Sequence, residues 1–276
     1  MPKNSLVSDS LPTGRRRADQ LVFEQGLTES REKAARLIMA GKVVAAAASS
    51  KGGPGDNHPG KAVTKAGHIY PATTRFFVTE SEPFVSRGAY KLLTALERFR
   101  IDVSGFVCLD AGASTGGFTD CLLQRGAARV YAVDVGRNQL HENLRRDARV
   151  VSLEGINLRR ADPALLPEPV DMVTADVSFI SLTLILPPCM YWLKGGGRTA
   201  VLIKPQFELG PGETVRGVVR DEAARQRAVD KIVTFCRETL GLRCDGVEPA
   251  ALKGPKGNQE YMAAFTLPEQ ITIENV

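Results

Sequence analysis

A glycine-rich loop between a strand and a helix constrains the fold more than any other part of this sequence. Residues 109–118 (LDAGASTGGF) follow an apolar run at 106–108 and precede a helical segment at 119–125 that Gly126 closes. A strand, a glycine loop and a helix in this order form the first unit of a nucleotide-binding α/β sheet. We therefore predict an α/β fold with a Rossmann-like, mostly parallel sheet.

The spacing of the glycines distinguishes this loop from a dinucleotide-binding loop. Gly112, Gly116 and Gly117 follow the pattern G-x-x-x-G-G, whereas the dinucleotide fingerprint is G-x-G-x-x-G. Asp110 stands two residues before the first glycine, where an acid can hold an amine. S-adenosylmethionine (SAM) carries an amine and has no pyrophosphate, so the loop fits SAM; an ordinary turn is the alternative.

A second acid ends the next predicted strand and fits a ribose. The strand covers residues 129–134, and its last residue, Asp134, lies 22 positions after Gly112. An acid at about this spacing accepts hydrogen bonds from ribose hydroxyls, and a surface aspartate that starts a turn is the alternative. The residues expected to bind the cofactor are Asp110, Gly112, Ser114, Gly116, Gly117, Phe118, Asp134 and Val135.

Length and composition exclude several classes of protein. The 276 residues suffice for one large domain, or for a large and a small one, and 43% of them are hydrophobic, which is ordinary for a globular protein. The sequence has no apolar run of about 18 residues and no apolar signal core near its start, so we expect a cytoplasmic protein without a membrane-spanning helix. The five cysteines form no C-x-x-C pair, which argues against a zinc site and a disulfide framework, and no metal is expected.

Positive charge is concentrated in the N-terminal part of the chain. Residues 1–80 carry 12 Lys/Arg and 7 Asp/Glu, whereas the rest of the chain carries 24 of each. A basic module before a neutral domain suggests a polyanionic partner. An excess of five charges is also compatible with an ordinary solvated surface.

This N-terminal part resembles the RNA-binding domain of the small-subunit ribosomal protein four, the S-four fold. The resemblance lies in residues 17–22 (RADQLV), 26–34 (GLTESREKA) and 37–44 (LIMAGKVV). The sequence departs from the family after this turn, where Gly, Pro and Ser at 46–61 predict an exposed flexible insertion. The resemblance assigns RNA contacts to Arg17, Arg31, Lys33, Arg36 and Lys42.

Charged residues end several of the predicted strands, where ligands bind in open α/β sheets. Asp176 ends a strand at 171–176, and Lys204 ends an apolar strand at 199–204, where a lysine needs a partner or a task. Glu260 begins a last, antiparallel strand, and Lys91 precedes the first strand. Two lysines and two carboxylates thus converge, which suits methyl transfer to a hydroxyl, because a lysine can stabilise the oxyanion or accept the proton.

Six motifs resemble the TlyA family of bacterial ribosomal RNA ribose methyltransferases, also called haemolysin A. They are SRGAYKL at 86–92, LDAGASTGGFTD at 109–120, YAVDVG at 131–136, ADVSFISL at 175–182, LIKPQFE at 202–208 and KGPKGNQEY at 253–261. The family's catalytic domain is similar to FtsJ-type ribose methyltransferases, which use a Lys-Asp-Lys-Glu tetrad. The resemblance places this tetrad on Lys91, Asp176, Lys204 and Glu260. It also implies cytidine as the target, and ribosomal RNA or ribosomal subunits as the partner.

On this basis we expect a SAM-dependent methyltransferase that modifies a ribose 2′-hydroxyl in ribosomal RNA. Its predicted fold is a Rossmann-like methyltransferase sheet of seven strands, the last antiparallel, after a small N-terminal α+β RNA-binding domain. The predicted parts are a flexible tail at 1–14, an S-four-like domain at 15–79, a linker at 80–86, an FtsJ-like methyltransferase domain at 87–268 and a tail at 269–276.

Two other classes of protein stay open at this point. The N-terminal unit could bind ribosomal RNA in a non-catalytic assembly protein, and the older family name suggests a haemolysin. A pore-forming protein needs an amphipathic or apolar insertion segment, and the sequence contains none. An amine-directed methyltransferase would often have Asn/Asp-Pro-Pro-aromatic after the fourth strand, where this chain has Asp176, Val177, Ser178 and Phe179.

Overall fold

The chain divides into two compact units, residues 1–83 and residues 84–276. The computed structural model describes residues 14–46, 59–79, 83–210 and 212–269. The two predicted tails except Gly14 and Glu269, most of the predicted insertion and the first part of the predicted linker lie outside these ranges. The last residues of the predicted insertion were assigned wrongly, because strand β3 (Pro59–Ala62) begins within them.

The N-terminal unit combines short strands with two helices in its described residues. Its other elements are β1 (Arg15–Arg17), α1 (Ala18–Glu24), α2 (Arg31–Met39), β2 (Val43–Ala46), β4 (Ile69–Pro71) and β5 (Phe76–Val78). Strand β1 pairs with β4, and β2 lies between β3 and β5. Helix α2 begins after Ser30, whose hydroxyl accepts a hydrogen bond from the backbone N–H of Lys33. Its apolar side is buried in the core of this unit through Leu37 and Ile38.

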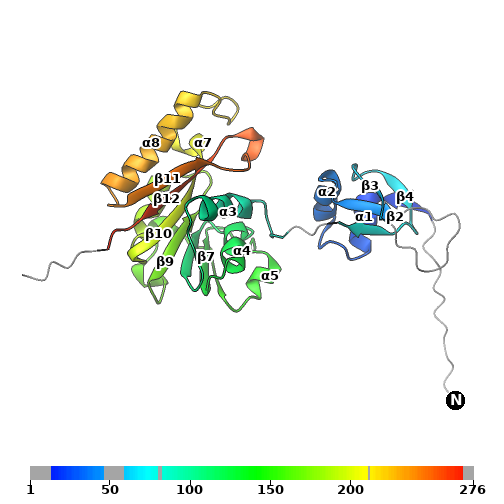
Figure 1. Cartoon of the computed structure of the whole chain (residues 1–276), viewed down its shortest axis with the longest axis horizontal. Helices are drawn as coiled ribbons and strands as arrows, with labels where there is room; N and C mark the ends of the chain where they lie inside the picture. The colour runs from blue at the N-terminus through cyan, green and yellow to red at the C-terminus, as the bar shows by residue number, and fades with distance from the viewer. Residues whose placement is uncertain (1–13, 47–58, 80–82, 211, 270–276) are drawn as a thin grey trace, which may run out of the picture. The chain divides into compact units, whose positions relative to one another are not determined.

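A seven-stranded sheet organises the C-terminal unit (Figure 1). Its strands are β6 (Val107–Ala111), β7 (Arg129–Asp134), β8 (Val150–Glu154), β9 (Val170–Ala175), β10 (Leu193–Ile203), β11 (Arg243–Pro249) and β12 (Tyr261–Thr266). Their order is β11-β12-β10-β9-β6-β7-β8, and β12 runs antiparallel to both of its neighbours. The predicted Rossmann-like sheet is confirmed. Its order reverses between β6 and β9, which is where ligands bind in such sheets.

Helices cover both faces of this sheet. They are α3 (Gly88–Arg98), α4 (Gly117–Gln124), α5 (Glu142–Arg145), α6 (Leu182–Cys189), α7 (Pro205–Glu208) and α8 (Glu222–Glu238), with short 3₁₀ turns η1 (Leu158–Arg160), η2 (Pro163–Leu165) and η3 (Pro255–Gly257). One core contains Leu92 of α3 and Leu122 of α4, and the other contains Leu186 of α6 and Ile232 of α8. Because both faces are covered, most residues of the central strands are apolar.

The longest strand differs from its predicted bounds. Gly195, Gly196 and Gly197 were expected to close the helix that starts at Leu182, but α6 ends at Cys189 and β10 already begins at Leu193. The three glycines lie inside β10, where its register against β9 shifts. Glycine runs of this kind mark irregular strands as well as helix ends, so the local sequence did not decide between them.

Candidate active site

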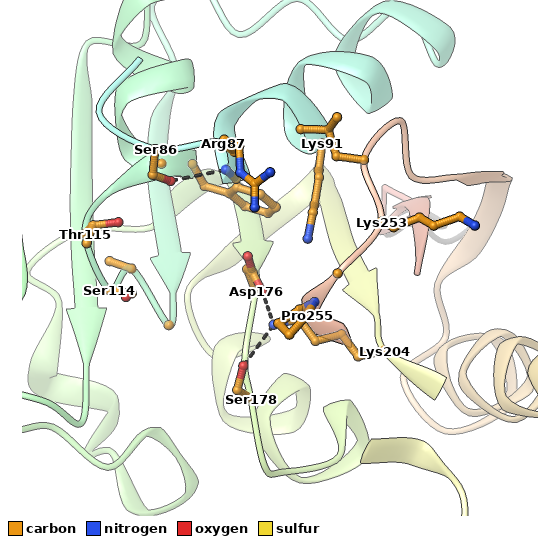
Figure 2. Close-up of a pocket in the computed structure, with 17 residues that line it drawn as sticks. Ser86, Arg87, Lys91, Ser114, Thr115, Asp176, Ser178, Lys204, Lys253 and Pro255 are labelled. Atoms are coloured by element: carbon orange, nitrogen blue, oxygen red, sulfur yellow. Dashed lines mark hydrogen bonds and ion pairs between the residues drawn. The ribbon is translucent and has the colours of Figure 1, made fainter. Parts of the chain in front are cut away.

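Two adjoining cavities lie at the carboxyl ends of the parallel strands, each with a volume of about 460 Å³. Both are lined by Gly112, Ser114, Asp176 and Ser178. The lysine cavity (Figure 2) is also lined by Ser86, Arg87, Gly88, Lys91, Ala113, Thr115, Gly117, Phe118, Lys204 and residues 252–255. The Asp134 cavity is also lined by Val133, Asp134, Val135, Gln139, Ile156, Asn157, Leu158, Arg159, Val177, Phe179, Ile180 and Ile185. They therefore meet where the strand order reverses between β6 and β9.

Asp134 holds the glycine loop in place beside the Asp134 cavity. Its Oδ2 accepts a hydrogen bond from the backbone N–H of Ser114 at 2.8 Å, and its Oδ1 accepts one from that of Gly136 at 2.7 Å. The side chains of Val135 and Ile185 line the same cavity. An acid next to apolar side chains suits a ribose with an attached aromatic base.

Gly112 keeps open the place where the two cavities meet. Its φ is +83°, and a Cβ there would lie 2.7 Å from the backbone oxygen of Asp176. Only glycine can therefore follow β6 in this conformation and pass so close to the end of β9. The absence of a side chain also leaves room for a ligand that extends through both cavities.

The structure does not support the predicted cofactor contact of Asp110. This residue lies inside β6 and is completely buried, so it lines neither cavity. Its carboxylate accepts hydrogen bonds from the hydroxyls of Thr119 at 2.7 Å and Thr174 at 3.0 Å. Burial raises the pKa of Asp110 to about 6. Asp110 thus connects β6 with α4 and β9.

Gly116 also lines neither cavity, although it was predicted to bind the cofactor. It lies at the N-terminal cap of α4 with a φ of +94°. A Cβ there would lie 2.3 Å from Leu144 Cδ1. The residue is therefore needed for the turn into α4, and its neighbours Gly117 and Phe118 are the ones that line the lysine cavity.

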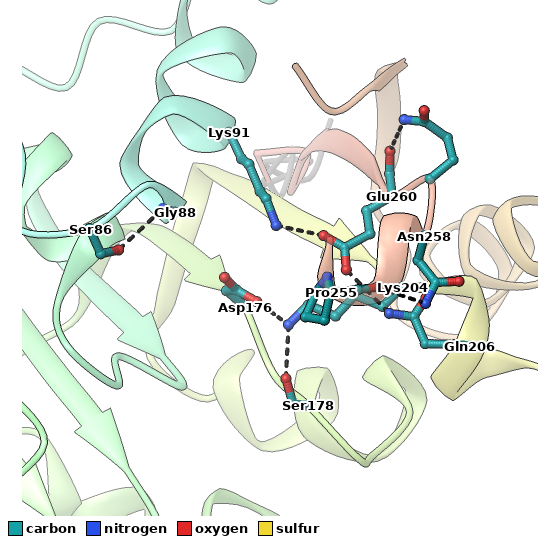
Figure 3. A network of polar contacts seen from close by, with 11 residues as sticks. Ser86, Gly88, Lys91, Asp176, Ser178, Lys204, Gln206, Pro255, Asn258 and Glu260 are labelled. Atoms are coloured by element: carbon teal, nitrogen blue, oxygen red, sulfur yellow. Dashed lines mark hydrogen bonds and ion pairs between the residues drawn. The ribbon is translucent and has the colours of Figure 1, made fainter. Parts of the chain in front are cut away.

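The four residues of the predicted tetrad form two lysine–carboxylate pairs (Figure 3). Lys91 contacts Glu260, with 2.5 Å between Nζ and Oε2. Lys204 pairs with Asp176 and donates a hydrogen bond to Ser178 Oγ at 3.0 Å. Both lysine side chains are only 11% exposed. Four separate segments of the chain thus bring these groups together.

Three members of the tetrad line the lysine cavity, and the fourth, Glu260, supports Lys91. Glu260 has no exposed surface, and its Oε1 accepts a hydrogen bond from Gln206 Nε2 at 3.2 Å. A buried carboxylate needs such partners, because an unpaired one strongly destabilises a fold. Each lysine is therefore held by a carboxylate, and the lysine side chains line the space where a substrate hydroxyl would lie.

Several cavity residues were missed by the sequence analysis. Ser178 and Phe179 belong to the motif at 175–182, but only its charged member, Asp176, was selected. Phe179 has a φ of +64°, is almost fully exposed, and packs its ring against Phe207 with 5.0 Å between centroids. A bulky residue in this conformation is strained, and the sequence gives no sign of that strain.

The residues predicted to contact RNA all lie in the N-terminal unit. Arg17 and Arg31 both pair with Asp19, with nitrogen–oxygen distances of 2.8 and 3.4 Å. Lys33 pairs with Glu29 at 3.1 Å. Of the other two, Arg36 is exposed on α2 and Lys42 is half-buried before β2. Their contact with RNA stays a prediction.

A comparison with known protein families matches residues 84–267 to the FtsJ-like methyltransferases. The chain belongs to this family. It is 46% identical over 249 residues to the 16S/23S rRNA (cytidine-2′-O)-methyltransferase TlyA of Mycobacterium tuberculosis, covering 90% of this chain and 88% of that protein. Hemolysin A of Brachyspira hyodysenteriae is 38% identical, covering 91% of this chain and all of that protein. The predicted resemblance to TlyA is confirmed.

A solved structure extends this similarity to most of the chain. It is described as a hemolysin of Streptococcus thermophilus, is 37% identical, and has a TM-score of 0.69 over 95% of this chain and 92% of that one. No helix of the described ranges is long and apolar enough to cross a membrane.

FtsJ-like methyltransferases use SAM, and the two cavities fit this cofactor. The Asp134 cavity has the acid and the apolar side chains that suit the nucleoside. Gly112 leaves open the junction with the lysine cavity, where the rest of the molecule would lie. When bound, SAM supplies an electrophilic methyl group carried by a sulfonium.

Proposed function

We propose that this protein transfers a methyl group from SAM to the 2′-hydroxyl of a ribose in ribosomal RNA, with cytidine as the target nucleoside. The observation that carries the proposal is the position of two lysine–carboxylate pairs, with both lysines buried, beside the glycine loop. The substrate is supported by relatives that are named rRNA (cytidine-2′-O)-methyltransferases.

The catalytic role falls on Lys91, Asp176, Lys204 and Glu260. A ribose hydroxyl is a weak nucleophile that must lose its proton as the new bond forms. Lys204, held by Asp176 and Ser178, stabilises the negative charge that develops on the oxygen. The proton is released to water, or Lys204 accepts it when its amine is neutral. Lys91, held by Glu260, adds a second positive charge from α3. Because both lysine side chains are mostly buried, their charges act more strongly than charges in free solution.

We assign cofactor binding to residues that line the two cavities. The residues proposed for SAM are Gly112, Ser114, Gly117, Phe118, Asp134 and Val135. Asp134 would accept hydrogen bonds from the ribose hydroxyls, and the loop would hold the methionine part. Alignment of the acceptor oxygen with the methyl group then supplies much of the rate acceleration.

In this proposal the N-terminal unit binds RNA and the C-terminal unit transfers the methyl group. We propose that residues 15–79 form an S-four-like RNA-binding domain. We also propose that the methyltransferase domain, predicted at 87–268, begins at Phe84, because Phe84 packs in its core and Ser86 lines the lysine cavity. The excess of positive charge within residues 1–80 supports this division. The partner would be ribosomal RNA or a ribosomal subunit in the cytoplasm.

The test is transfer of label from methyl-labelled SAM to ribosomal RNA by the purified full chain. A 2′-O-methyl group blocks alkaline cleavage of the adjacent phosphodiester, so the label should appear in alkali-resistant dinucleotides that contain cytidine. Label in a base or in protein would contradict the proposal. Binding of RNA without transfer of label would favour the non-catalytic assembly protein instead.

A further inference from the structure

We propose that Asp19 is a positioning residue that presents Arg17 and Arg31 together to the phosphates of the RNA backbone. The proposal rests on the RNA-binding function proposed for the N-terminal unit. It adds to that function a buried acid that the family resemblance did not select. An acid at an RNA-binding surface is unexpected, because its charge opposes the attraction between the protein and the phosphates.

The contacts of Asp19 join three elements of the N-terminal unit. Its Oδ1 accepts a hydrogen bond from Arg17 Nε at 3.0 Å, and its Oδ2 accepts one from Arg17 Nη2 at 2.8 Å. The same Oδ2 accepts a hydrogen bond from Arg31 Nη2 at 3.4 Å. Arg17 ends β1, Asp19 lies in the first turn of α1, and Arg31 begins α2. One carboxylate therefore holds two arginines that are 14 positions apart.

Burial holds the Asp19 carboxylate in one position, although its two arginine partners are exposed. Asp19 is 4% exposed, whereas the side chains of Arg17 and Arg31 are 47% and 49% exposed. The hydrogen bond from Arg17 lowers the pKa of Asp19, so the carboxylate keeps its charge at neutral pH. The two Nη2 atoms contact one oxygen, so they lie within 6.2 Å of each other, the sum of the two distances.

The remaining edges of the two guanidinium groups suit a phosphate. Arg17 uses its Nε and Nη2 edge for Asp19, and a guanidinium has further N–H donors in the same plane. Phosphate oxygens accept such paired donors from arginine. Two guanidinium groups held this close bind one phosphate or two neighbouring ones. Less side-chain freedom is then lost on binding than for two free arginines.

A nearby ion pair of the same type provides a matched control. Arg16 contacts Glu24 through its Nη1, at 2.9 Å from each carboxylate oxygen. Glu24 also lies on α1, but its side chain is 36% exposed and it holds a single arginine of β1. Replacing Asp19 or Glu24 by its amide changes the net charge equally, by one positive unit. Simple electrostatics predicts that both changes strengthen RNA binding. The positioning role predicts instead that the change at Asp19 weakens RNA binding and that the change at Glu24 does not.

The experiment measures binding of the full chain to in vitro transcribed 16S and 23S ribosomal RNA between 50 and 200 mM salt, by filter retention. For Asp19→Asn we expect affinity to fall about fivefold or more, and for Glu24→Gln we expect it to stay equal or rise. Asp19→Asn should add no further loss to the Arg17→Ala/Arg31→Ala double variant, because its effect passes through those two arginines. Equal or tighter binding by Asp19→Asn would overturn the proposal, and so would a further loss in the double variant.

Failure of the underlying function would look different. If Arg17→Ala/Arg31→Ala binds both RNAs as tightly as the unchanged chain, the N-terminal unit does not bind RNA through this face, and the proposed function of that unit fails. If the double variant loses affinity and Asp19→Asn does not, only the positioning role of Asp19 fails. Arg17→Lys keeps the charge but not the paired donors, so it should weaken binding in the same direction as Asp19→Asn.

Discussion

Strands β9 and β10 carry a lysine–aspartate pair at each end, and only one of the two lines the candidate active site. At the amino ends, Lys194 Nζ lies 2.6 Å from Asp171 Oδ1, and the lysine side chain is 43% exposed. At the carboxyl ends, Lys204 pairs with Asp176, and the lysine side chain is 11% exposed. The residue types are the same, and so are the two strands that carry them.

The difference between the pairs lies in their surroundings. The carboxyl ends of the strands border the glycine loop, Ser178 and a cavity of about 460 Å³, whereas the Lys194 side chain is partly exposed at the surface. An exposed ion pair contributes little, because solvent screens it. A pair beside a ligand cavity acts on whatever charge develops there. Position in the sheet, and not residue type, therefore distinguishes the two lysines.

The largest expected effect is on catalysis. Lys204→Ala should lower the rate of methyl transfer about 10³-fold, because it removes the charge that stabilises the oxyanion. Binding of ribosomal RNA should change less than threefold. Lys194→Ala, on the same strand, should keep the rate within twofold. Single-turnover transfer of labelled methyl groups checks both, and equal rates for the two variants would contradict the assignment of Lys204.

The next effect is on stability. Lys91→Met should lower the free energy of unfolding of the C-terminal unit by about 3–5 kcal/mol, because it leaves Glu260 buried without its cationic partner. Lys194→Met should lower the free energy of unfolding by less than about 1 kcal/mol. Urea unfolding followed by the fluorescence of Trp192, the one tryptophan of the chain, reports this unit. If both variants lose a similar free energy of unfolding, burial does not determine how much each lysine contributes to stability.

Asp110 offers a pH-dependent test within the same sheet. Its pKa is raised from 3.8 to about 6 in the folded chain, so its contribution to stability is present below pH 4 and is lost as the pH rises towards 6. Asp110→Asn removes this loss. Between pH 4 and pH 7, the free energy of unfolding of the variant should therefore rise by up to about 3 kcal/mol relative to that of the unchanged chain. A difference in unfolding free energy that does not vary with pH would contradict a raised pKa.

The smallest expected effect concerns the cofactor. Asp134→Ala should raise the dissociation constant of SAM about tenfold, because it removes the proposed ribose acceptor and two hydrogen bonds that shape the loop. Asp171→Ala, at the other end of the sheet, should leave this constant within twofold. Isothermal titration calorimetry measures both. Unchanged affinity in Asp134→Ala would remove Asp134 from the proposed site.

Much of the C-terminal unit could be predicted because its signals are local. The glycine loop, the apolar strands and the cap at Asp221, which accepts hydrogen bonds from two backbone N–H groups of α8, depend on neighbouring residues. The convergence of Lys204 and Asp176 also follows from chain order, because each comes directly after one of two neighbouring parallel strands. Such features need only the periodicity of each segment and the topology of the sheet.

Other features could not be predicted because they depend on which way a side chain points. The apolar run at 106–108 predicted that Asp110 follows its strand, but β6 continues to Ala111, and the residue therefore lies within the strand. Gln206 binds Glu260 across 54 positions, and Asp19 joins two arginines from different elements. No local pattern encodes such contacts, because tertiary packing creates them.

The position of β12 between two strands that precede it in the sequence has a consequence for the synthesis of this chain. Strand β12 lies between β10 and β11, and Glu260, immediately before it, completes the pair with a lysine 169 positions earlier. A nascent chain on the ribosome can fold its N-terminal unit early, but it lacks this glutamate until residue 260 has left the exit tunnel. Methylating activity should therefore appear only after residue 260 has left the tunnel, later than the folding of the N-terminal unit.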